Sequence, residues 1–216
     1  MTDVKDLPSK GWYVVVRDIL VGLCRVIFRV RVFGKERVPP SGSYILAPSH
    51  RSILDIPFTA FVTRRRIRFM AKRELFKTKI ARWIWEHFAA IEVDRGTSDR
   101  GALRATQLAI EGGEPVGIFP EGTRRTGPVL CNLFDGVAYL ALKTGAPIVP
   151  VGIGGSEAIM PRGKTIPRPR RVTVVVGSPI CVPRATGTVK RTDVAALTER
   201  LRIELQSRFD EASMRA

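Results

Sequence analysis

The sequence is poor in the residue types that most often build metal, redox and disulfide sites. Its three cysteines lie far apart without a Cys-x-x-Cys pair, and it has only two histidines. An odd number of widely spaced cysteines argues against a disulfide framework and against a zinc cluster. We therefore expect no metal, no cofactor and a reducing compartment.

Long uncharged apolar runs are also absent. The most apolar stretch, residues 11–33, is interrupted by charged residues and stays well short of the ~20 apolar residues that a membrane-spanning helix needs. The polar start of the chain contains acidic residues and shows no cleavable signal pattern. The sequence therefore predicts a chain that does not cross a membrane.

Residues 11–33 nevertheless have the periodicity of an amphipathic helix. At about 100° per residue, Arg17, Arg25 and Arg29 share a sector of about 120°. Apolar residues fill much of the remaining circumference, namely Trp12, Val15, Ile19, Leu23, Val26 and Val30. The pattern fits a helix in a membrane interface with its arginines toward the head groups, and it equally fits a core helix with a solvated arginine stripe. Aromatic residues near its start favour the interface.

Acidic residues are outnumbered: the chain has 36 Lys and Arg against 20 Asp and Glu, a net charge of +16. Such a field attracts nucleic acid, anionic lipid or phosphorylated substrates. Two basic clusters, residues 64–68 and 162–171, lack interleaved aromatic residues for base stacking, and no DNA-reading helix signature is present. An anionic membrane surface is therefore the expected partner, and a nucleic-acid-binding module is the alternative.

Short apolar segments alternate with helical patterns through the rest of the chain. The predicted strands are 44–48, 67–70, 91–94, 116–119, 148–153 and 172–176. The predicted helices are 52–63, 78–90, 99–111, 136–144 and 193–212. This alternation indicates an α/β fold, a mostly parallel sheet flanked by helices. We divide the chain into an amphipathic membrane-interface segment, residues 1–33, and one globular domain, residues 34–216.

One of the two histidines, His50, directly follows the apolar strand 44–48, where α/β sheets place their ligand sites. On a continuous helix, Asp55 lies about 140° from His50, so the two cannot share a helix face. If Ser52 caps a helix, His50 lies in the preceding loop and the Asp55 carboxylate can reach the imidazole Nδ1. This arrangement leaves Nε2 as a general base for a hydroxyl. A purely structural histidine is the alternative.

A second motif, FPEGTR at residues 119–124, runs from a strand into a glycine-containing turn. Backbone N–H groups around Gly122 and Thr123 can form an anion nest, and the Arg124 guanidinium can bind phosphate oxygens. A phosphate site beside a base predicts a phosphorylated alcohol as substrate. Arg95 also stands just past a short strand, where a capping or surface arginine is the alternative.

Together these segments resemble the glycerolipid acyltransferase family, that is, glycerol-3-phosphate and lysophosphatidic acid acyltransferases. SHRSILD (49–55) is similar to the family's His-x4-Asp motif, IEVDRG (91–96) to its second motif, FPEGTR to its third and IVPV (148–151) to its fourth. Four motifs in the family's order are far more specific than any single one. The resemblance implies the family's α/β fold with a membrane-associating N-terminal helix.

The resemblance implies that His50, oriented by Asp55, deprotonates the acceptor hydroxyl, which attacks the thioester of acyl-CoA or acyl carrier protein without an acyl-enzyme. It implies a phosphate site formed by Arg95, Glu121, Gly122, Thr123, Arg124 and Lys72. Lysophosphatidic acid is the expected acceptor and phosphatidic acid the product, with glycerol-3-phosphate as the alternative acceptor. The expected location is the cytoplasmic face of the cell membrane, as a peripheral or monotopic protein.

Two positions depart from the family pattern. Ser49 stands where asparagine is usual, a small polar change that should keep the turn. Asp135 stands where lysine is common. This reversal of charge is expected to bear on acceptor or donor preference.

Two other enzyme classes fit the sequence less well. Residues 158–165 match the loosest nucleotide-binding phosphate-loop signature, but Pro161 removes an N–H from the loop, and prolines 167 and 169 oppose the helix that must follow. A serine or cysteine hydrolase lacks its Gly-x-Ser-x-Gly elbow, and Cys131 has no helix N-terminus to activate it.

Overall fold

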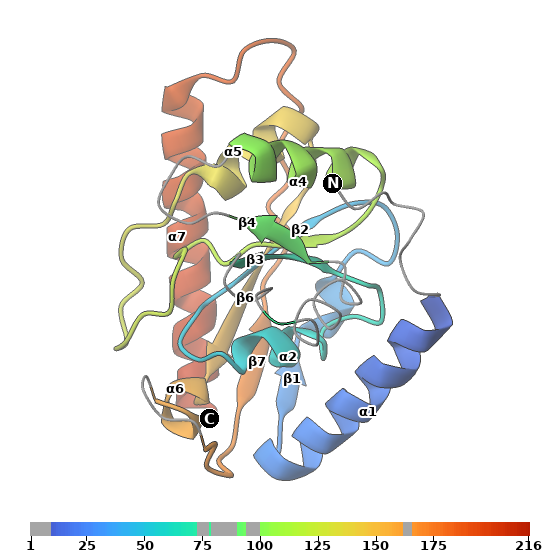
Figure 1. Ribbon diagram of the computed structural model, residues 1–216. Coiled ribbons are helices and arrows are strands. Elements are labelled where there is room, and N and C mark those ends of the chain that lie inside the picture. The colour runs from blue at the N-terminus through green and yellow to red at the C-terminus, as the bar shows by residue number, and fades with distance from the viewer. Residues whose placement is uncertain (1–9, 73–77, 79–89, 94–99, 162–165) are drawn as a thin grey trace.

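The computed structural model describes residues 10–72, 78, 90–93, 100–161 and 166–216 (Figure 1). Within these residues a central sheet has helices on both faces, as the alternating pattern predicts. The predicted helix 78–90 lies almost wholly outside the described residues.

Seven strands of the described chain form the sheet, in the order β1-β7-β6-β2-β5-β3-β4. Their bounds are β1 (Arg31–Phe33), β2 (Ile45–Pro48), β3 (Arg68–Lys72), β4 (Ile91–Val93), β5 (Val116–Gly117), β6 (Ile148–Gly154) and β7 (Thr173–Val176). All neighbouring strands are parallel except β6 and β7. The carboxyl ends of β6, β2, β5, β3 and β4 therefore lie along one edge, where open α/β sheets bind ligands.

The described helices are α1 (Lys10–Phe28), η2 (Lys35–Arg37), α2 (Asp55–Thr59), α4 (Arg100–Glu111), α5 (Gly136–Thr144), α6 (Ser156–Ile159) and α7 (Arg191–Met214). Helices α4, α5 and α7 pack on one face of the sheet, and α1 and α2 pack on the other. Strand β2 separates these two layers, because its side chains alternate between the faces. Ile45 belongs to the first cluster and Leu46 to the second.

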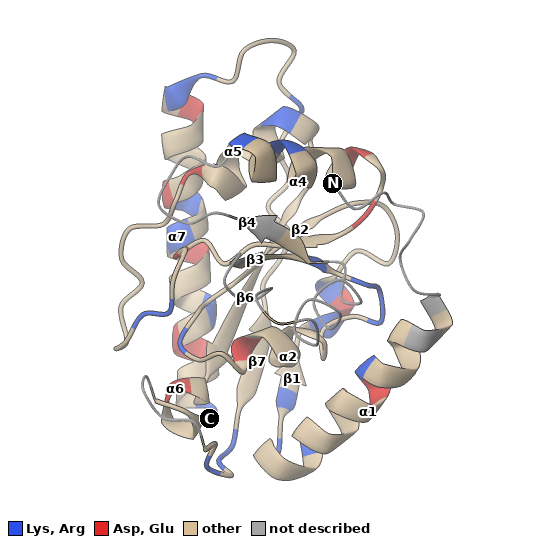
Figure 2. Cartoon of the chain, viewed as in Figure 1, with Lys and Arg blue, Asp and Glu red and all other residues tan. Residues whose placement is uncertain are grey.

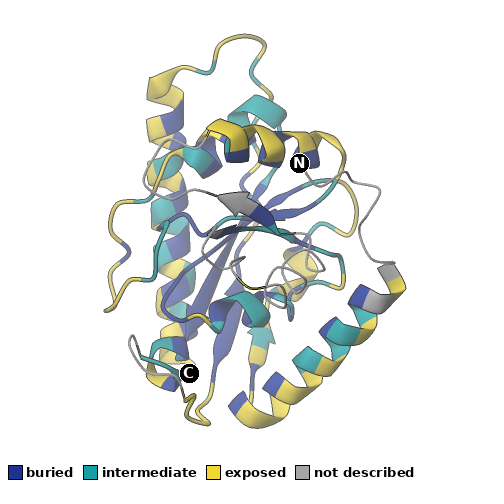
Figure 3. Cartoon of the chain, viewed as in Figure 1, coloured by how far each residue is buried: buried dark blue, intermediate teal, exposed yellow. Residues whose placement is uncertain are grey.

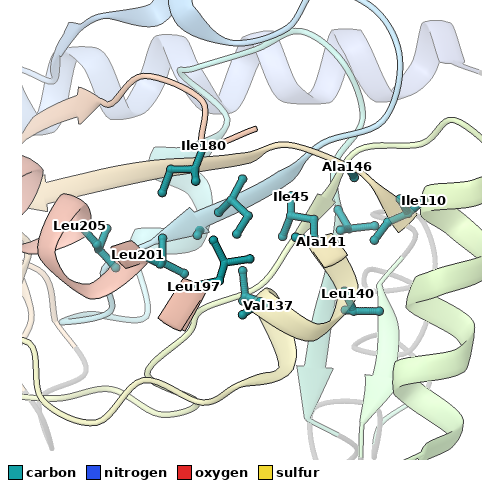
Figure 4. Packing of buried hydrophobic residues seen from close by; sticks show 14 of the residues in the cluster. Ile45, Ile110, Val137, Leu140, Ala141, Ala146, Ile180, Leu197, Leu201 and Leu205 are labelled. Atoms are coloured by element: carbon teal, nitrogen blue, oxygen red, sulfur yellow. The ribbon is translucent and has the colours of Figure 1, made fainter. Parts of the chain in front are cut away.

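In the layer formed by α4, α5 and α7, helix α7 packs along the sheet and against α5. Leu197, Leu201 and Leu205 of α7 meet Val137 and the neighbouring residues of α5 over the sheet (Figure 4). The helix also lies close against β6, because two glycines of that strand leave room for its backbone. A Cβ on Gly152 would lie 2.1 Å from the Arg208 carbonyl oxygen, and one on Gly154 would lie 2.3 Å from the backbone of Ala212. Alanine at either position would push the helix off the strand.

Several element boundaries differ from the predictions. The helix predicted over 52–63 shortens to α2 (Asp55–Thr59), and the chain beyond it continues in turns. Strand β1 and helix α6 were not predicted, because elements of three and four residues carry too little periodicity. By contrast, α5 spans the predicted range 136–144.

Helix α1 presents an apolar face on each side. Tyr13, Cys24 and Phe28 are buried against the domain, in the layer that contains α2. The opposite side exposes an apolar stripe, which consists of Val15, Ile19, Leu23 and Val26. Much of α1 has the colour of exposed residues in Figure 3. One face therefore packs into the core, as the core-helix alternative predicted. The other face is uncovered, and its contact with a membrane stays a prediction.

Arg17 corrects one detail of the interfacial interpretation. It was predicted to face lipid head groups, yet it is only 7% exposed. Its Nε donates a hydrogen bond to the Ala60 carbonyl at 3.0 Å, and its guanidinium also pairs with Asp18. Arg17 therefore anchors α1 to the domain. Among the described residues, no helix combines the length and apolarity needed to span a bilayer.

Candidate active site

The predicted site residues follow the carboxyl ends of four adjacent parallel strands. His50 comes after β2, the FPEGTR motif after β5, and Lys72 ends β3. Lys72 pairs with Val93, the last residue of β4, two positions before Arg95. The chain therefore leaves the sheet at one edge in all four segments. Arg95 itself, and the side chain of Lys72, lie outside the described part of the structure.

Ser49 joins the site loop to the sheet. Its backbone N–H donates to the Val151 carbonyl at 2.9 Å, and its Oγ accepts the Ile153 N–H at 2.9 Å. Both bonds tie the end of β2 to β6. Serine therefore keeps this turn, as predicted, and the following residue enters the site from a fixed backbone.

His50 and Asp55 form the predicted contact. The imidazole Nδ1 lies 3.1 Å from Asp55 Oδ2, and both side chains are buried. The same carboxylate oxygen accepts the N–H groups of Arg51 and Ser52, each at 2.6 Å. Three donors on one oxygen fix the orientation of the carboxylate. The predicted cap is wrong in one respect, because the helix begins at Asp55 and not directly after Ser52.

The imidazole is held on one of its faces as well. Its ring stacks on Phe119 with a centroid separation of 4.0 Å, and Phe119 in turn stacks on Phe69 at 5.9 Å. Because the carboxylate accepts at Nδ1, the proton belongs on that nitrogen and Nε2 carries the lone pair. Nε2 has no hydrogen-bond partner among the described residues, so it is open to a substrate hydroxyl.

The FPEGTR turn lies against the histidine loop, as the pairing of the two motifs predicts. The Arg125 N–H donates to the His50 carbonyl at 2.9 Å. Gly122 has a φ of +66°, and a Cβ there would lie 2.5 Å from the Phe134 ring, so both conformation and packing require glycine. Its N–H donates to the Phe119 carbonyl at 3.0 Å. The predicted anion nest is therefore wrong for the Gly122 N–H, which is already used inside the turn.

Glu121 also departs from its predicted place in the phosphate site. Its side chain is fully buried, and Oε1 accepts the His50 N–H at 2.8 Å. Arg51 Nη1 donates to both carboxylate oxygens, at 2.9 Å and 2.6 Å. A carboxylate enclosed in this way has no oxygen to offer, and it would repel a phosphate. The prediction of a phosphate ligand at this position is corrected to a residue that holds the loop.

Thr123 and Arg124 remain suited to the predicted role. Both side chains are half-buried, and neither has a hydrogen-bond partner within the described ranges. The Arg124 guanidinium is thus an uncommitted cation in the turn that contacts His50. Guanidinium groups bind phosphate oxygens through paired donors.

Sequence reasoning missed Arg51, whose side chain is 1% exposed. A buried arginine needs an acidic partner, and the partner lies seventy residues away in the chain. The only available signal was its position between His50 and Asp55. Asp135 has a local role as well, since its Oδ1 accepts the Thr198 hydroxyl at 2.8 Å and links the start of α5 to α7.

An apolar cavity of about 200 Å³ lies between α1, α2 and β3. Its lining includes Leu20, Ile53, Ile56, Pro57, Ile67 and Phe69. Phe69 stacks on Phe119, and Phe119 stacks on the His50 imidazole. These two ring contacts connect the cavity wall with the imidazole. Among the described residues, no group of three or more His, Cys, Asp or Glu side chains is placed to hold a metal ion.

Comparison with known proteins places these features in context. A family profile described as "Acyltransferase" matches residues 29–154. The 1-acyl-sn-glycerol-3-phosphate acyltransferase of Bacillus subtilis is 29% identical over 186 residues, which cover 84% of this chain and 90% of that protein. A protein of the same name from Chlamydomonas reinhardtii is 32% identical over 154 residues, 69% of this chain. The chain spans 46% of that algal relative.

The crystal structure of the 1-acyl-sn-glycerophosphate (LPA) acyltransferase PlsC from Thermotoga maritima is similar with a TM-score of 0.77. The match covers 98% of this chain and 83% of that chain at 22% sequence identity. At this identity the likeness concerns the fold.

Proposed function

This chain belongs to the acyltransferase family, and on that premise we propose that it moves a fatty acyl group from a thioester to the free hydroxyl of 1-acylglycerol-3-phosphate, giving phosphatidic acid. One observation carries the proposal. The buried His50–Asp55 pair, with Nε2 unoccupied, lies against a turn that holds the uncommitted Arg124. A base beside a phosphate-binding cation suits a phosphorylated alcohol.

In the proposed reaction, His50 Nε2 removes the proton of the acceptor hydroxyl while its oxygen attacks the thioester carbonyl. The Asp55 carboxylate stabilises the imidazolium that forms. When the tetrahedral intermediate collapses, the C–S bond breaks and the imidazolium returns the proton to the leaving thiolate. The products are an ester and a thiol, and no protein group is acylated.

The acceptor phosphate is proposed to bind the Arg124 guanidinium, with Thr123 as a second donor. Lys72 and Arg95 are proposed partners, because β3 ends at Lys72 and β4 ends two residues before Arg95, at the same edge of the sheet. Several cations suit a phosphate monoester, which carries about −1.5 to −2 charges at neutral pH.

The apolar cavity beside Phe69 supports a fatty acyl chain as the transferred group. Its lining is mostly aliphatic and aromatic, with Arg17 and Thr59 as its charged and hydroxyl side chains, and it favours methylene groups over a polar substituent. Phe69 in its wall stacks on Phe119, which stacks on the imidazole, so the cavity lies two rings away from the base. The thioester carrier is either coenzyme A or acyl carrier protein, since both present the same kind of thioester.

The exposed stripe of α1 supports a location at the membrane surface. Ile19 is 67% exposed and Val26 is 79% exposed, although both are large aliphatic residues. Fully burying one such side chain contributes about 1.5–3 kcal/mol. We propose that the stripe docks on an anionic bilayer as a peripheral or monotopic attachment, at the cytoplasmic face. Basic residues occur on α1, α4, α5 and α7 (Figure 2), so the charge is spread over several elements.

A mass-resolved assay tests the proposal. Purified protein is mixed with acyl-CoA or acyl carrier protein donors of several lengths and with lysophosphatidic acid or glycerol-3-phosphate as acceptor. We expect phosphatidic acid from lysophosphatidic acid, and no product with His50→Ala of unchanged thermal stability. Faster product formation from glycerol-3-phosphate would establish the alternative acceptor. Normal turnover by His50→Ala, or acylated protein after mixing with donor alone, would refute the mechanism.

A further inference from the structure

We propose that Arg51 and Glu121 form a buried positioning pair, which sets the main chain of His50 and clamps the phosphate turn against it. The proposal rests on the function proposed for His50. It assigns to Glu121 a role other than phosphate binding, and it adds Arg51 to the residues on which the reaction depends.

Glu121 binds His50 through the backbone and not through the imidazole. The His50 N–H donates to Glu121 Oε1 at 2.8 Å. The Asp55 carboxylate accepts the next two N–H groups, from Arg51 and Ser52. Three consecutive N–H groups are therefore taken by two buried carboxylates. The loop cannot shift without breaking one of these bonds.

Arg51 connects that loop to the turn. Its Nη1 donates to the His50 carbonyl at 3.1 Å and to both Glu121 oxygens. Its Nε donates to the Gly127 carbonyl at 3.1 Å, and Nη2 donates to the Val129 carbonyl at 3.4 Å. One guanidinium thus bridges the two segments that must present the base and the phosphate site together.

The planar shape of this guanidinium is needed for all of these contacts. It lies over the Phe209 ring, 4.7 Å from the ring centroid. The guanidinium therefore also contacts helix α7, which packs against the sheet. A lysine at the same position would keep the charge, but its single ammonium cannot reach three carbonyls and a carboxylate at once. Arg51→Lys therefore removes the bridge while it leaves the charge balance intact.

Neither residue is placed to bind substrate directly. The Arg51 side chain is 1% exposed and that of Glu121 is fully buried. Both carboxylate oxygens and all three guanidinium nitrogens have protein partners. Loss of the pair is therefore expected to displace the base relative to the phosphate turn and to lower kcat. Arg124 stays on its own turn and still binds the phosphate, so the acceptor KM should change little. A displacement of about 1 Å at a reacting group lowers the rate by about a hundredfold.

The experiment compares Arg51→Lys and Glu121→Gln with Arg68→Lys, a control that perturbs a partly buried arginine–glutamate pair on β3. Imidazole NMR reports the position of His50 directly, because the chain has one other histidine, His87, as internal reference. We expect both test variants to shift the His50 resonances and to lower kcat by about a hundredfold. The acceptor KM of both test variants should stay within about threefold of wild type. The control Arg68→Lys should change neither the His50 resonances nor kcat.

A double variant, Arg51→Met with Glu121→Gln, removes both buried charges and serves if a single variant does not fold. It should also have low kcat, because the bridge to Gly127 and Val129 is absent. An unshifted His50 spectrum with normal kcat in any folded variant would overturn the proposal. A raised acceptor KM at normal kcat for Glu121→Gln would establish a phosphate ligand instead. Activity retained by His50→Ala would refute the general base itself, a separate outcome.

Discussion

Asp55→Asn tests how much of the reaction depends on the negative charge beside His50. Asp55 Oδ2 accepts two backbone N–H groups and the imidazole Nδ1 proton, whereas Oδ1 is buried without a partner in the described chain. The two backbone donors favour the amide oxygen of asparagine at the Oδ2 position. The imidazole therefore keeps its orientation and tautomer, and the variant loses the charge alone.

The magnitude follows from the distance between the charges. An imidazolium 3.1 Å from a carboxylate is stabilised by about 5 kcal/mol at an effective dielectric constant of about 20. The neutral hydrogen bond that remains in Asp55→Asn offsets about 1 kcal/mol of this loss. A net loss of about 4 kcal/mol in the transition state corresponds to a kcat lower by about a thousandfold.

The measurement is kcat with saturating donor and acceptor, together with the thermal unfolding temperature. Asp55→Asn should unfold near the wild-type temperature, because its amide oxygen still accepts the N–H groups of Arg51 and Ser52. Asp55→Ala leaves those groups unsatisfied and should lose about 1–3 kcal/mol of stability as well. A kcat for Asp55→Asn within about tenfold of wild type would refute the electrostatic argument.

Three further predictions concern substrate binding, membrane attachment and pH. Arg124→Ala should raise the acceptor KM by about 10- to 100-fold at similar kcat, since a charged hydrogen bond contributes about 1.5–3 kcal/mol; an unchanged KM would remove Arg124 from the phosphate site. Ile19→Glu with Val26→Glu should abolish flotation with anionic liposomes without changing the unfolding temperature, because both side chains are exposed; undiminished flotation would contradict docking through this stripe. Burial raises the pKa of Tyr13 above its ordinary 10.0 and that of Cys24 above 9.0. The unfolded chain therefore ionises first, and stability present below about pH 9 should fall as the pH rises through the raised values. Urea midpoints at increasing pH check this, and Tyr13→Phe with Cys24→Ala should flatten the loss.

The sequence alone determined the alternation of strands and helices and the pairing of His50 with Asp55. Both are local properties. Hydrophobic periodicity acts within one element, which is why α5 begins and ends as predicted. Only six residues, 49–54, separate the end of β2 from the start of α2. So short a connection leaves few ways to place the imidazole of His50 and the carboxylate of Asp55, and their contact follows from that geometry.

Tertiary structure decided which of several allowed partners each side chain takes. Helix α1 is apolar on two faces, so its periodicity cannot say which face meets the domain, and Arg17 is buried because Ala60 supplies a carbonyl. The motif predicts Glu121 as a phosphate-site residue, yet its carboxylate binds the Arg51 guanidinium, seventy positions earlier in the chain. Pairings between residues so distant depend on how the sheet brings its strands together, and no local pattern records that arrangement.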